Sequence, residues 1–255
     1  GKIVGMSAQK SAAEFEVSVS VLKQMFLYLD SLDVDREAFL RSLGLDPALP
    51  DSPDAYLSLE TYLLIQDQAA EYTRDPYFGL HMGEYAEAGS WSILGYLMAN
   101  CDTLGEAFQK SGRYQRIIGN LITGEPKLGF NKIKVIYDTP AHAPRMSRHC
   151  FEAAFSSGVR IMRSLTGKDL SPMEVTFIYP EPASREEYER VFRCPVIFNH
   201  KHNSMTISPG IINTPIQFSN PGLKKYFENY AQEFLVELDT RNEHTNQVTR
   251  IILSN

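Results

Sequence analysis

Apolar positions in the first 120 residues recur every three to four residues, the spacing of amphipathic helices. Gly44 follows one such run and can take the left-handed conformation that ends a helix, whereas Ser58 precedes another and can cap it. Thr103 and Glu106 have the spacing of a capping box, in which each side chain bonds the other residue's backbone amide. The helices predicted here cover residues 19–29, 39–43, 59–72 and 104–119, with a short one after Asp75-Pro76.

The period changes after Asn120, where Ile133, Val135 and Tyr137 alternate with polar residues as in a half-buried strand. We expect this strand to form a hairpin with residues 121–123 through a turn at 124–129. A second hairpin is expected between residues 196–198 and 205–207, across the polar turn 200–204. The other predicted elements are a helix from Pro144 to Gly167, a strand over 174–179, a helix opened by a capping box at 184–187, and a final helix from Asn220 whose apolar face holds Leu223, Tyr226, Phe227, Tyr230, Phe234 and Leu238.

This order of elements predicts an α+β fold: an N-terminal helical subdomain, then a mostly antiparallel sheet of two hairpins and a further strand, covered by helices. We expect residues 1–16 to be a disordered or leader segment, 17–120 the helical subdomain, and 121–238 the α+β part of the same domain. Residues 239–246 are polar, and a new apolar pattern begins at Val248. Residues 239–255 are therefore interpreted as a linker and the first helix of a further domain.

Composition and charge exclude several classes of protein. The chain has 255 residues with a net charge of −6, so we expect no DNA binding by this chain alone. A run of roughly 18 apolar residues is absent, which excludes a membrane-spanning helix, and no secretory signal is visible, which favours the cytoplasm. Cys101, Cys150 and Cys194 are odd in number and lack metal-site spacing, so they are interpreted as core thiols.

The common catalytic and cofactor-binding motifs are absent, including the dinucleotide, phosphate-loop, zinc-protease and hydrolase patterns. His200 and His202 lack a nearby carboxylate or thiolate, so solvated turn residues explain them better than a metal site does. His149 and Cys150 are neighbours on a predicted helix and point apart, which excludes a nucleophile pair. We expect no enzyme activity, no metal and no cofactor.

Polar residues on an apolar helical face are the strongest candidates for a binding site. Ser111 and Gln115 fall within the apolar stripe of the helix predicted over 104–119. Buried side chains of this kind need hydrogen-bond partners, which either the chain's own backbone or a ligand supplies. A ligand with one polar end would satisfy them while its apolar body packs on aromatic rings. The candidate ligand-binding residues are Trp91, Tyr96, Ser111, Tyr114, Gln115, Phe151 and Phe155, of which Trp91 and Tyr96 also fit a plain core role.

The helix predicted from Pro144 to Gly167 has two different faces. Phe151 and Phe155 lie on its core face together with Gly158, which would let another element approach closely. His149, Arg160 and Arg163 fall on the opposite face, where we expect solvent or an interface.

Short motifs over residues 19–238 resemble a known family by their order and spacing. They are Asp75–Glu84, Gly95-Tyr96, Thr103–Phe108, Arg113-Tyr114, Glu187–Phe192, Cys194–Phe198 and Asn203-Ser204. Together they are similar to the effector-binding domain of AraC/XylS-type transcription regulators, in the branch whose sensor is not a cupin barrel.

The resemblance implies a bacterial ligand-sensing and dimerising domain, followed by a DNA-binding domain with two helix-turn-helix units, whose first helix residues 239–255 would begin. It does not identify the ligand, which the polar and aromatic candidates suggest is a small amphipathic or hydrophobic effector, and it implies DNA contact only through the absent domain. The homodimer would form through residues 223–238 or through Arg160 and Arg163. Two alternatives remain: a haem-binding gas sensor, for which neither His81 nor His149 is a convincing axial ligand, and a protein-interaction domain without a small ligand.

Overall fold

The structure is a computed structural model that describes residues 15–52 and 54–253, with side chains described up to residue 241. The first half of this part is helical. Its α-helices are α2 (Leu22–Ser31), α3 (Arg36–Ser42), α4 (Leu59–Thr73), α5 (Phe78–Gly83), α6 (Ser92–Ala99) and α7 (Leu104–Tyr114), with 3-10 turns η1 (Val19–Val21), η2 (Leu49–Asp51), η3 (Ala88–Trp91) and η4 (Gln115–Ile117). Strands β1 (Glu16–Ser18) and β2 (Tyr56–Ser58) pair antiparallel and lead into η1 and α4.

The second half holds the larger sheet and the longest helices. Its elements are β3 (Thr123–Gly129), β4 (Lys132–Asp138), α8 (Arg148–Thr166), β5 (Glu174–Thr176), α9 (Arg185–Phe192), β6 (Val196–Ile197), β7 (Asn203–Ile207), η5 (Pro209–Asn213) and α10 (Pro221–Leu253). In the described chain the strands follow the order β3-β4-β7-β5-β6. The pairs β3–β4, β4–β7 and β7–β5 are antiparallel and β5–β6 is parallel. The α+β class predicted from the sequence is confirmed.

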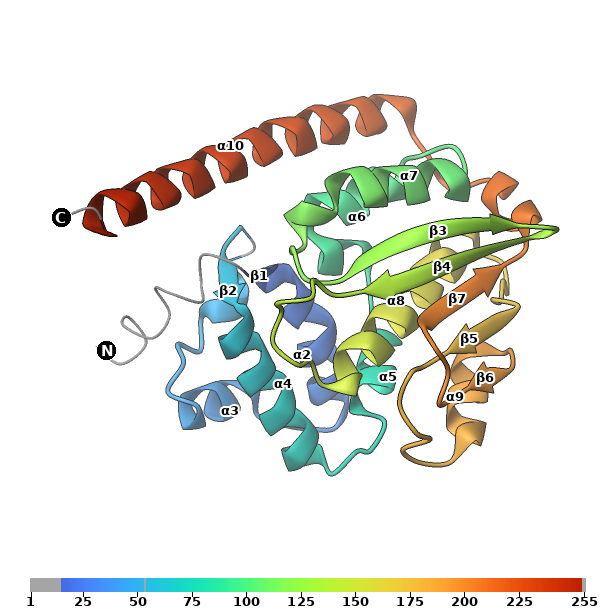
Figure 1. The fold of residues 1–255 in the computed structure, drawn as a ribbon, viewed down its shortest axis with the longest axis horizontal. Coiled ribbons are helices and arrows are strands. Elements are labelled where there is room, and N and C mark those ends of the chain that lie inside the picture. The colour runs from blue at the N-terminus through green and yellow to red at the C-terminus, as the bar shows by residue number, and fades with distance from the viewer. Residues whose placement is uncertain (1–14, 53, 254–255) are drawn as a thin grey trace.

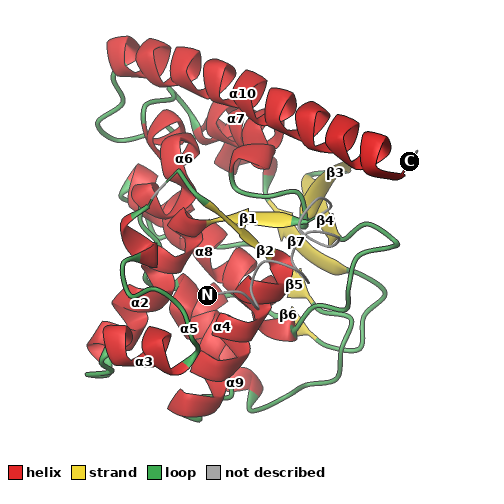
Figure 2. Ribbon diagram, turned by 90° about the vertical axis from the view of Figure 1, so that its left-hand side faces the viewer, coloured by secondary structure: helices red, strands yellow, loops and turns green. Residues whose placement is uncertain are grey.

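Helix α8 lies at the centre of the molecule, and the helices gather on one side of the sheet (Figure 2). Cys150 and Ala153 of α8 belong to the core of the helical part, together with residues of α2 and α4. One turn further along, Phe155 and Val159 belong to the core beneath the sheet. A single helix therefore packs into both cores. Helix α10 crosses the top of the molecule above α6 and α7 (Figure 1).

Several helix ends are formed as the sequence predicts. The Ser58 hydroxyl accepts the Thr61 amide at the start of α4, and Gly167 ends α8 with φ +65°. The Thr103 hydroxyl accepts the Glu106 amide at 3.3 Å and caps α7, which is one half of the predicted capping box; the Glu106 carboxylate pairs with Lys224 instead of returning to Thr103. The capping box predicted at 184–187 is wrong, because Ser184 makes no side-chain bond at the start of α9.

The predicted hairpins needed two corrections. Residues 124–129 form strand β3 and not a turn, and the chain reverses at Phe130-Asn131, where Asn131 takes φ +54°. Pro126 fits there because β3 is an edge strand, on which a missing N–H is tolerated. The second hairpin is wrong because β5 lies between β6 and β7. Strand β6 reaches β5 in parallel through α9, since a parallel pair needs a crossover connection.

Helix α10 is continuous through residues 239–246, where we expected a polar linker. The reason is that the chain holds neither glycine nor proline from Leu223 to its end, so nothing breaks the backbone pattern. The predicted apolar face also divides: Phe234 and Leu238 are buried with Ala231, whereas Leu223, Tyr226 and Tyr230 are exposed. Among the described residues no helix, α10 included, is long and apolar enough to cross a membrane.

Two expectations about α8 are wrong. No atom lies within 4 Å of a Cβ added to Gly158, so this glycine marks no close approach. Arg163 does not face solvent: its guanidinium donates to the carbonyls of Leu170, Val191 and Phe192 and so holds the end of α9. Arg160 is exposed, as expected.

The close approach to α8 comes from the glycines of α5. A Cβ at Gly79 would lie 2.2 Å from the His149 carbonyl oxygen, and one at Gly83 would lie 2.5 Å from the Ser156 Cβ. Because both obstacles belong to the backbone or to the first side-chain atom of α8, they cannot rotate away. The glycines that allow this close helix contact are therefore on α5, and not on α8 as we expected from Gly158.

We expect Gly79→Ala to lower the free energy of unfolding by about 1–3 kcal/mol, because the added methyl group forces α5 away from α8. The matched control is Gly158→Ala, which meets open space on α8 and should raise the free energy of unfolding by about 0.5–1 kcal/mol. Urea unfolding followed by circular dichroism measures both. Equal stability changes of the two variants would contradict the packing described here.

Candidate functional site

A groove of about 440 Å³ lies between α7 and α10. One wall comes from α7 and the other from the first turns of α10. It is lined by Glu106, Gln109, Lys110, Lys224, Lys225 and Glu228. The α7 residues share a face because they are three or four positions apart, and the α10 residues do so for the same reason.

Ion pairs connect the two walls of this groove. The Lys224 ammonium lies 3.0 Å from Glu106 and 3.5 Å from Asp102, and the Lys110 ammonium lies 3.0 Å from Glu228. The Tyr114 hydroxyl donates to Glu228 Oε1 at 2.6 Å. Burial alone would raise the pKa of Glu228, but the hydrogen bonds from Tyr114 and Lys110 outweigh it, so the pKa of Glu228 is lowered. Its carboxylate is therefore charged near neutral pH.

Aromatic rings pack where α6 meets α10. The Tyr96 ring stacks on Phe227 with centroids 5.7 Å apart, and Tyr226 packs edge-on against Phe227 at 5.4 Å. Tyr96 is partly open to solvent, whereas Trp91 packs against the core. These rings place an aromatic contact between α6 and the same turns of α10 that line the groove.

The seven predicted ligand-binding residues are divided between two places. Trp91, Tyr96, Ser111, Tyr114 and Gln115 lie on η3, α6, α7 and η4, and of these elements α6 and α7 lie beneath α10 in Figure 1. Phe151 and Phe155 lie on α8. The Phe155 ring is buried between Tyr137, at 4.7 Å, and Phe177, at 5.3 Å.

Two of the polar candidates already have partners within the chain. Tyr114, 1% exposed, donates to Glu228, and Gln115 donates its amide to the Ile122 carbonyl. Sequence reasoning missed the lysines and the glutamate of α10, which face α7 across more than a hundred residues of chain. Their local signal is a row of charges among aromatics at 224–228, which the sequence alone does not connect to α7.

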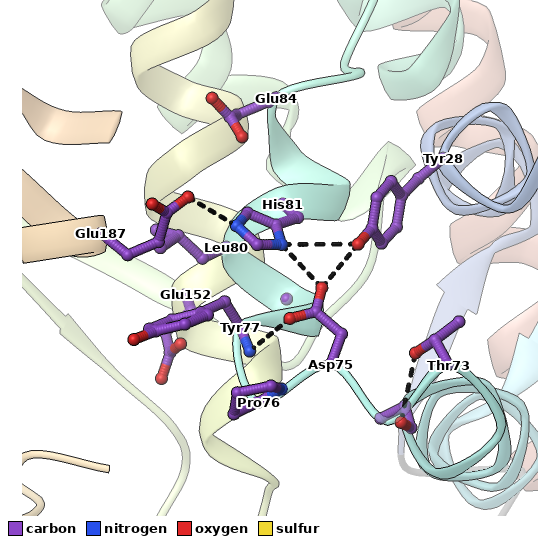
Figure 3. A network of polar contacts seen from close by, with 12 residues as sticks. Tyr28, Thr73, Asp75, Pro76, Tyr77, Leu80, His81, Glu84, Glu152 and Glu187 are labelled. Atoms are coloured by element: carbon purple, nitrogen blue, oxygen red, sulfur yellow. Dashed lines mark hydrogen bonds and ion pairs between the residues drawn. The ribbon is translucent and has the colours of Figure 1, made fainter. Parts of the chain in front are cut away.

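A second polar site joins α2, α5 and α9 around His81 (Figure 3). His81 Nδ1 lies 2.6 Å from Asp75 Oδ2, and its Nε2 lies 2.7 Å from Glu187 Oε1. The Tyr28 hydroxyl also donates to Asp75 Oδ2, at 2.6 Å. Burial would lower the pKa of His81, but its hydrogen bonds to Asp75 and Glu187 outweigh burial, and the pKa is raised above its ordinary value.

Next to this site, Glu152 of α8 is a carboxylate with 0% exposure. Its oxygens accept hydrogen bonds at 2.8 Å from the Tyr179 and Tyr188 hydroxyls and at 3.2 Å from the Arg148 guanidinium. Burial raises the pKa of Glu152 in spite of these donors. The network connects α8 with α9 and with the segment that follows β5.

The sequence led us to expect His149 on a face toward solvent or an interface, but the side chain packs against α5. Its Nδ1 accepts the Gly79 amide at 3.0 Å, at the point where α5 touches α8. Burial and the neighbouring Arg148 lower the pKa of His149 to about 4, so its ring is neutral. Over the described part of the chain, no group of three or more His, Cys, Asp or Glu side chains could hold a metal ion.

Comparison with known proteins identifies the family. Residues 34–216 match the family described as the arabinose-binding domain of AraC transcription regulator, N-terminal. The chain belongs to this family. The matched range includes α7 and, except for Tyr28, every residue of the His81 and Glu152 networks of this AraC-type domain. The groove residues Lys224, Lys225 and Glu228 lie beyond the matched range. The resemblance found in the sequence is confirmed.

Curated relatives of this AraC-type domain are transcription regulators. The chain is 25% identical over 223 residues to the ornithine utilization regulator of Pseudomonas aeruginosa, covering 87% of this chain and 65% of the relative. It is 20% identical over 225 residues to the HTH-type transcriptional regulator VirS of Mycobacterium tuberculosis, covering 87% and 66%. The chain thus spans about two thirds of the length of these relatives.

A solved structure has the same fold. The crystal structure of the transcriptional regulator CdpR from Pseudomonas aeruginosa superimposes with a TM-score of 0.59 at 16% identity, covering 84% of this chain and 65% of that one. At this identity the likeness establishes the fold of the AraC-type domain and nothing about its ligand.

We expect Tyr188→Phe to lower the free energy of unfolding by about 1.5–3 kcal/mol, because it removes a hydrogen bond to the buried Glu152 carboxylate. Tyr77→Phe is the control: its ring contacts Tyr188 at 5.5 Å, but its hydroxyl donates to the Ser184 carbonyl at an exposed position. The control should stay within about 0.5 kcal/mol of the parent in denaturant unfolding. A Tyr188→Phe variant as stable as the Tyr77→Phe variant would show that Glu152 does not depend on this donor.

Proposed function

We propose that this domain senses a small-molecule effector and passes its presence to the rest of an AraC-type regulator through α10. Membership of the family and the similarity to transcription regulators support this role. In such a regulator, contact with DNA would be made outside this chain, whose net charge is −6. Bacterial transcription regulators act on the chromosome, so a cytoplasmic location follows from the proposal.

The observation that carries the proposal is the groove between α7 and α10. A ligand held there touches a helix of the family domain and the long helix that follows the family's matched range. Binding can therefore change the position of α10 directly, without passing through the core. This is what a sensor needs, because a ligand shifts a conformational equilibrium only through contacts that differ between the two states.

The effector we propose has a polar end and a short apolar body. The polar end would meet the lysines of the groove and Glu228, which Tyr114 holds, and the apolar body would pack on Tyr96 and Phe227. Ornithine, whose utilization one relative is named for regulating, carries charged groups on an aliphatic chain and is a suitable first probe. Ser111, Gln115, Trp91, Phe151 and Phe155 remain predicted contacts, with Phe155 requiring the largest rearrangement because its ring is packed on both sides.

Of the two alternatives, the haem sensor has the weaker support. Both ring nitrogens of His81 lie within hydrogen-bond distance of carboxylates, and Nδ1 of His149 is used by the Gly79 amide. The other alternative, a protein-interaction domain, is an outcome of the following test.

We expect ornithine to bind the purified chain in isothermal titration calorimetry. Tyr114→Phe should weaken that binding roughly tenfold, because the Tyr114 hydroxyl holds the Glu228 carboxylate that lines the groove, and a hydrogen bond to a charged group contributes about 1.5–3 kcal/mol. Tyr72→Phe, an exposed tyrosine on α4, is the control and should leave the affinity unchanged.

Two results would count against the assignment. Binding that is equally strong in Tyr114→Phe would move the ligand to another site. No binding of ornithine, or of a panel of amphipathic amines and carboxylic acids, would favour the protein-interaction domain.

We also propose a homodimer formed through the outer face of α10. Leu223, Tyr226 and Tyr230 recur along this face at helical spacing and are 47%, 62% and 39% exposed. Paired copies would suit a regulator that reads paired DNA half-sites. Arg163 is no longer a candidate, because the backbone of the chain itself uses its guanidinium.

We expect sedimentation velocity at about 50 μM to show a dimer. At this concentration an interface of standard size is occupied. Tyr226→Ser with Tyr230→Ser should shift the protein to monomer without a loss of helix content, since neither ring is buried in the core. Leu32→Ser, an equally exposed apolar residue on another surface, is the control. A parent protein that remains monomeric would contradict the dimer.

A further inference from the structure

His81 connects parts of the chain that are far apart in sequence. It lies on α5, its Nδ1 meets Asp75 before that helix, and its Nε2 meets Glu187 on α9, 106 residues away. Figure 3 shows the imidazole between the two carboxylates, with the Tyr28 hydroxyl of α2 pointing at the same Asp75 oxygen. The ring therefore links the helical part of the molecule to the α9 crossover of the sheet part.

The geometry requires a protonated ring. A neutral imidazole carries one N–H donor and one acceptor nitrogen, whereas the imidazolium carries two donors. The two carboxylate oxygens at 2.6 and 2.7 Å are both acceptors when ionised. If the ring loses its second proton, one of these contacts becomes a repulsion between lone pairs, and α9 or the Asp75 segment must move away.

Groups on every neighbouring element define the charge around the ring. Tyr28 of α2 and the Tyr77 amide donate to Asp75, which leaves Asp75 a full acceptor for His81.

The Arg190 side chain of α9 bonds both Glu187 and Glu84, at 2.7 and 2.9 Å. On α8, Arg148 is bound by Glu152 and by the Pro76 carbonyl, and His149 stays neutral. The cation nearest to Glu187 besides His81 is thus already shared with Glu84.

We propose that His81 is a pH-sensitive clasp that holds α9 against the helical part of the domain when its ring is protonated and releases α9 when it is not. The clasp does not require the effector proposed above. It would make the relative position of the two halves of the domain, and of the Glu152 network beside them, depend on the proton concentration.

The pH range of the clasp follows from the direction of each shift. The pKa of His81 is raised above 6.5, so the stabilisation is complete below 6.5 and is lost as the pH rises through the raised value. The pKa values of Asp75 and Glu187 are lowered, from 3.8 and 4.5, so their contribution is complete above those values and is lost only in stronger acid. The clasp is therefore closed in weakly acidic solution and opens as the pH rises through the raised pKa of His81.

Proton NMR of the histidine Hε1 signals tests the protonation state. In the full chain we expect one signal, assigned to His81 by its loss in His81→Gln, to titrate with a midpoint above 6.5, and the His149 signal not to titrate above pH 5. Glu187→Gln should lower the His81 midpoint by on the order of one pH unit, since it removes one of two opposite charges. Glu181→Gln removes a carboxylate that pairs with Arg185 beside α9 and should leave the midpoint unchanged.

Hydrogen exchange of the α9 amides tests the clasp itself. We expect the protection factors of α9, relative to those of α4 in the same sample, to fall as the pH rises through the His81 midpoint. This pH dependence should disappear in His81→Gln, which has no proton to lose, and should persist in Glu181→Gln.

A His81 midpoint at or below 6.5 would overturn the proposal. So would the same fall of α9 protection with pH in His81→Gln as in the parent. If His81→Gln does not fold, Glu187→Gln serves in its place: its α9 protection must be lower than that of the parent at pH 6, and an unchanged value would also overturn the proposal.

Discussion

The approach of α5 to α8 is the constraint on which the rest of the structure depends. Gly79 and Gly83 bring the two backbones so close that side chains cannot lie between them. Polar contacts across the seam therefore run to the backbone: Ser156 donates to the Leu80 carbonyl at 2.7 Å, and the Gly79 amide donates to His149. Because α8 packs into both cores, this one contact sets the position of the helical part relative to the sheet.

Polar side chains gather where that seam opens toward α9. Glu152 is buried without exposure, and removing a carboxylate from water costs several kcal/mol unless donors surround it. Two tyrosine hydroxyls and one guanidinium supply those donors from three separate segments. An apolar residue of similar size would avoid the cost of desolvation, but it would not fix the direction from which α9 approaches. The network therefore determines the position of α9 more than it adds to stability, and His81 acts on the same helix.

Features carried by neighbouring residues could be predicted from the sequence. Ser58, Thr103 and Gly167 form helix ends because their chemistry acts within four residues, and the order of short motifs was sufficient to identify the family. Pairing between distant segments could not be predicted in the same way. Val196 and Ile197 alternate as a hairpin strand would, yet β5 occupies the place beside β7.

The groove was predictable only in part, for the same reason. Tyr114 stood out as a polar group on an apolar face, and its hydroxyl donates to Glu228, which lines the groove. Its partner Glu228 is 114 residues away on a helix that the sequence divided at residue 239. Arg163 illustrates the opposite error. Its position on the face of α8 opposite the core was assigned to solvent, although the last carbonyls of α9 lie on that side and accept hydrogen bonds from its guanidinium.

The strength of the attachment of α10 decides whether a ligand in the groove can act on the rest of a regulator. Further along the helix, Ala231, Phe234 and Leu238 are buried and hold α10 by apolar contact. At the groove the attachment is polar, and partly exposed ion pairs contribute only about 0–1 kcal/mol each. A coupling of about 1–3 kcal/mol between two sites changes an equilibrium roughly 5- to 150-fold. A ligand would replace the contacts of Lys224, Lys110 and Tyr114 by its own. The free-energy difference of that exchange lies within the same range. In the function proposed here, the first turns of α10 would therefore respond to a ligand, while its buried middle turns keep the helix on the domain.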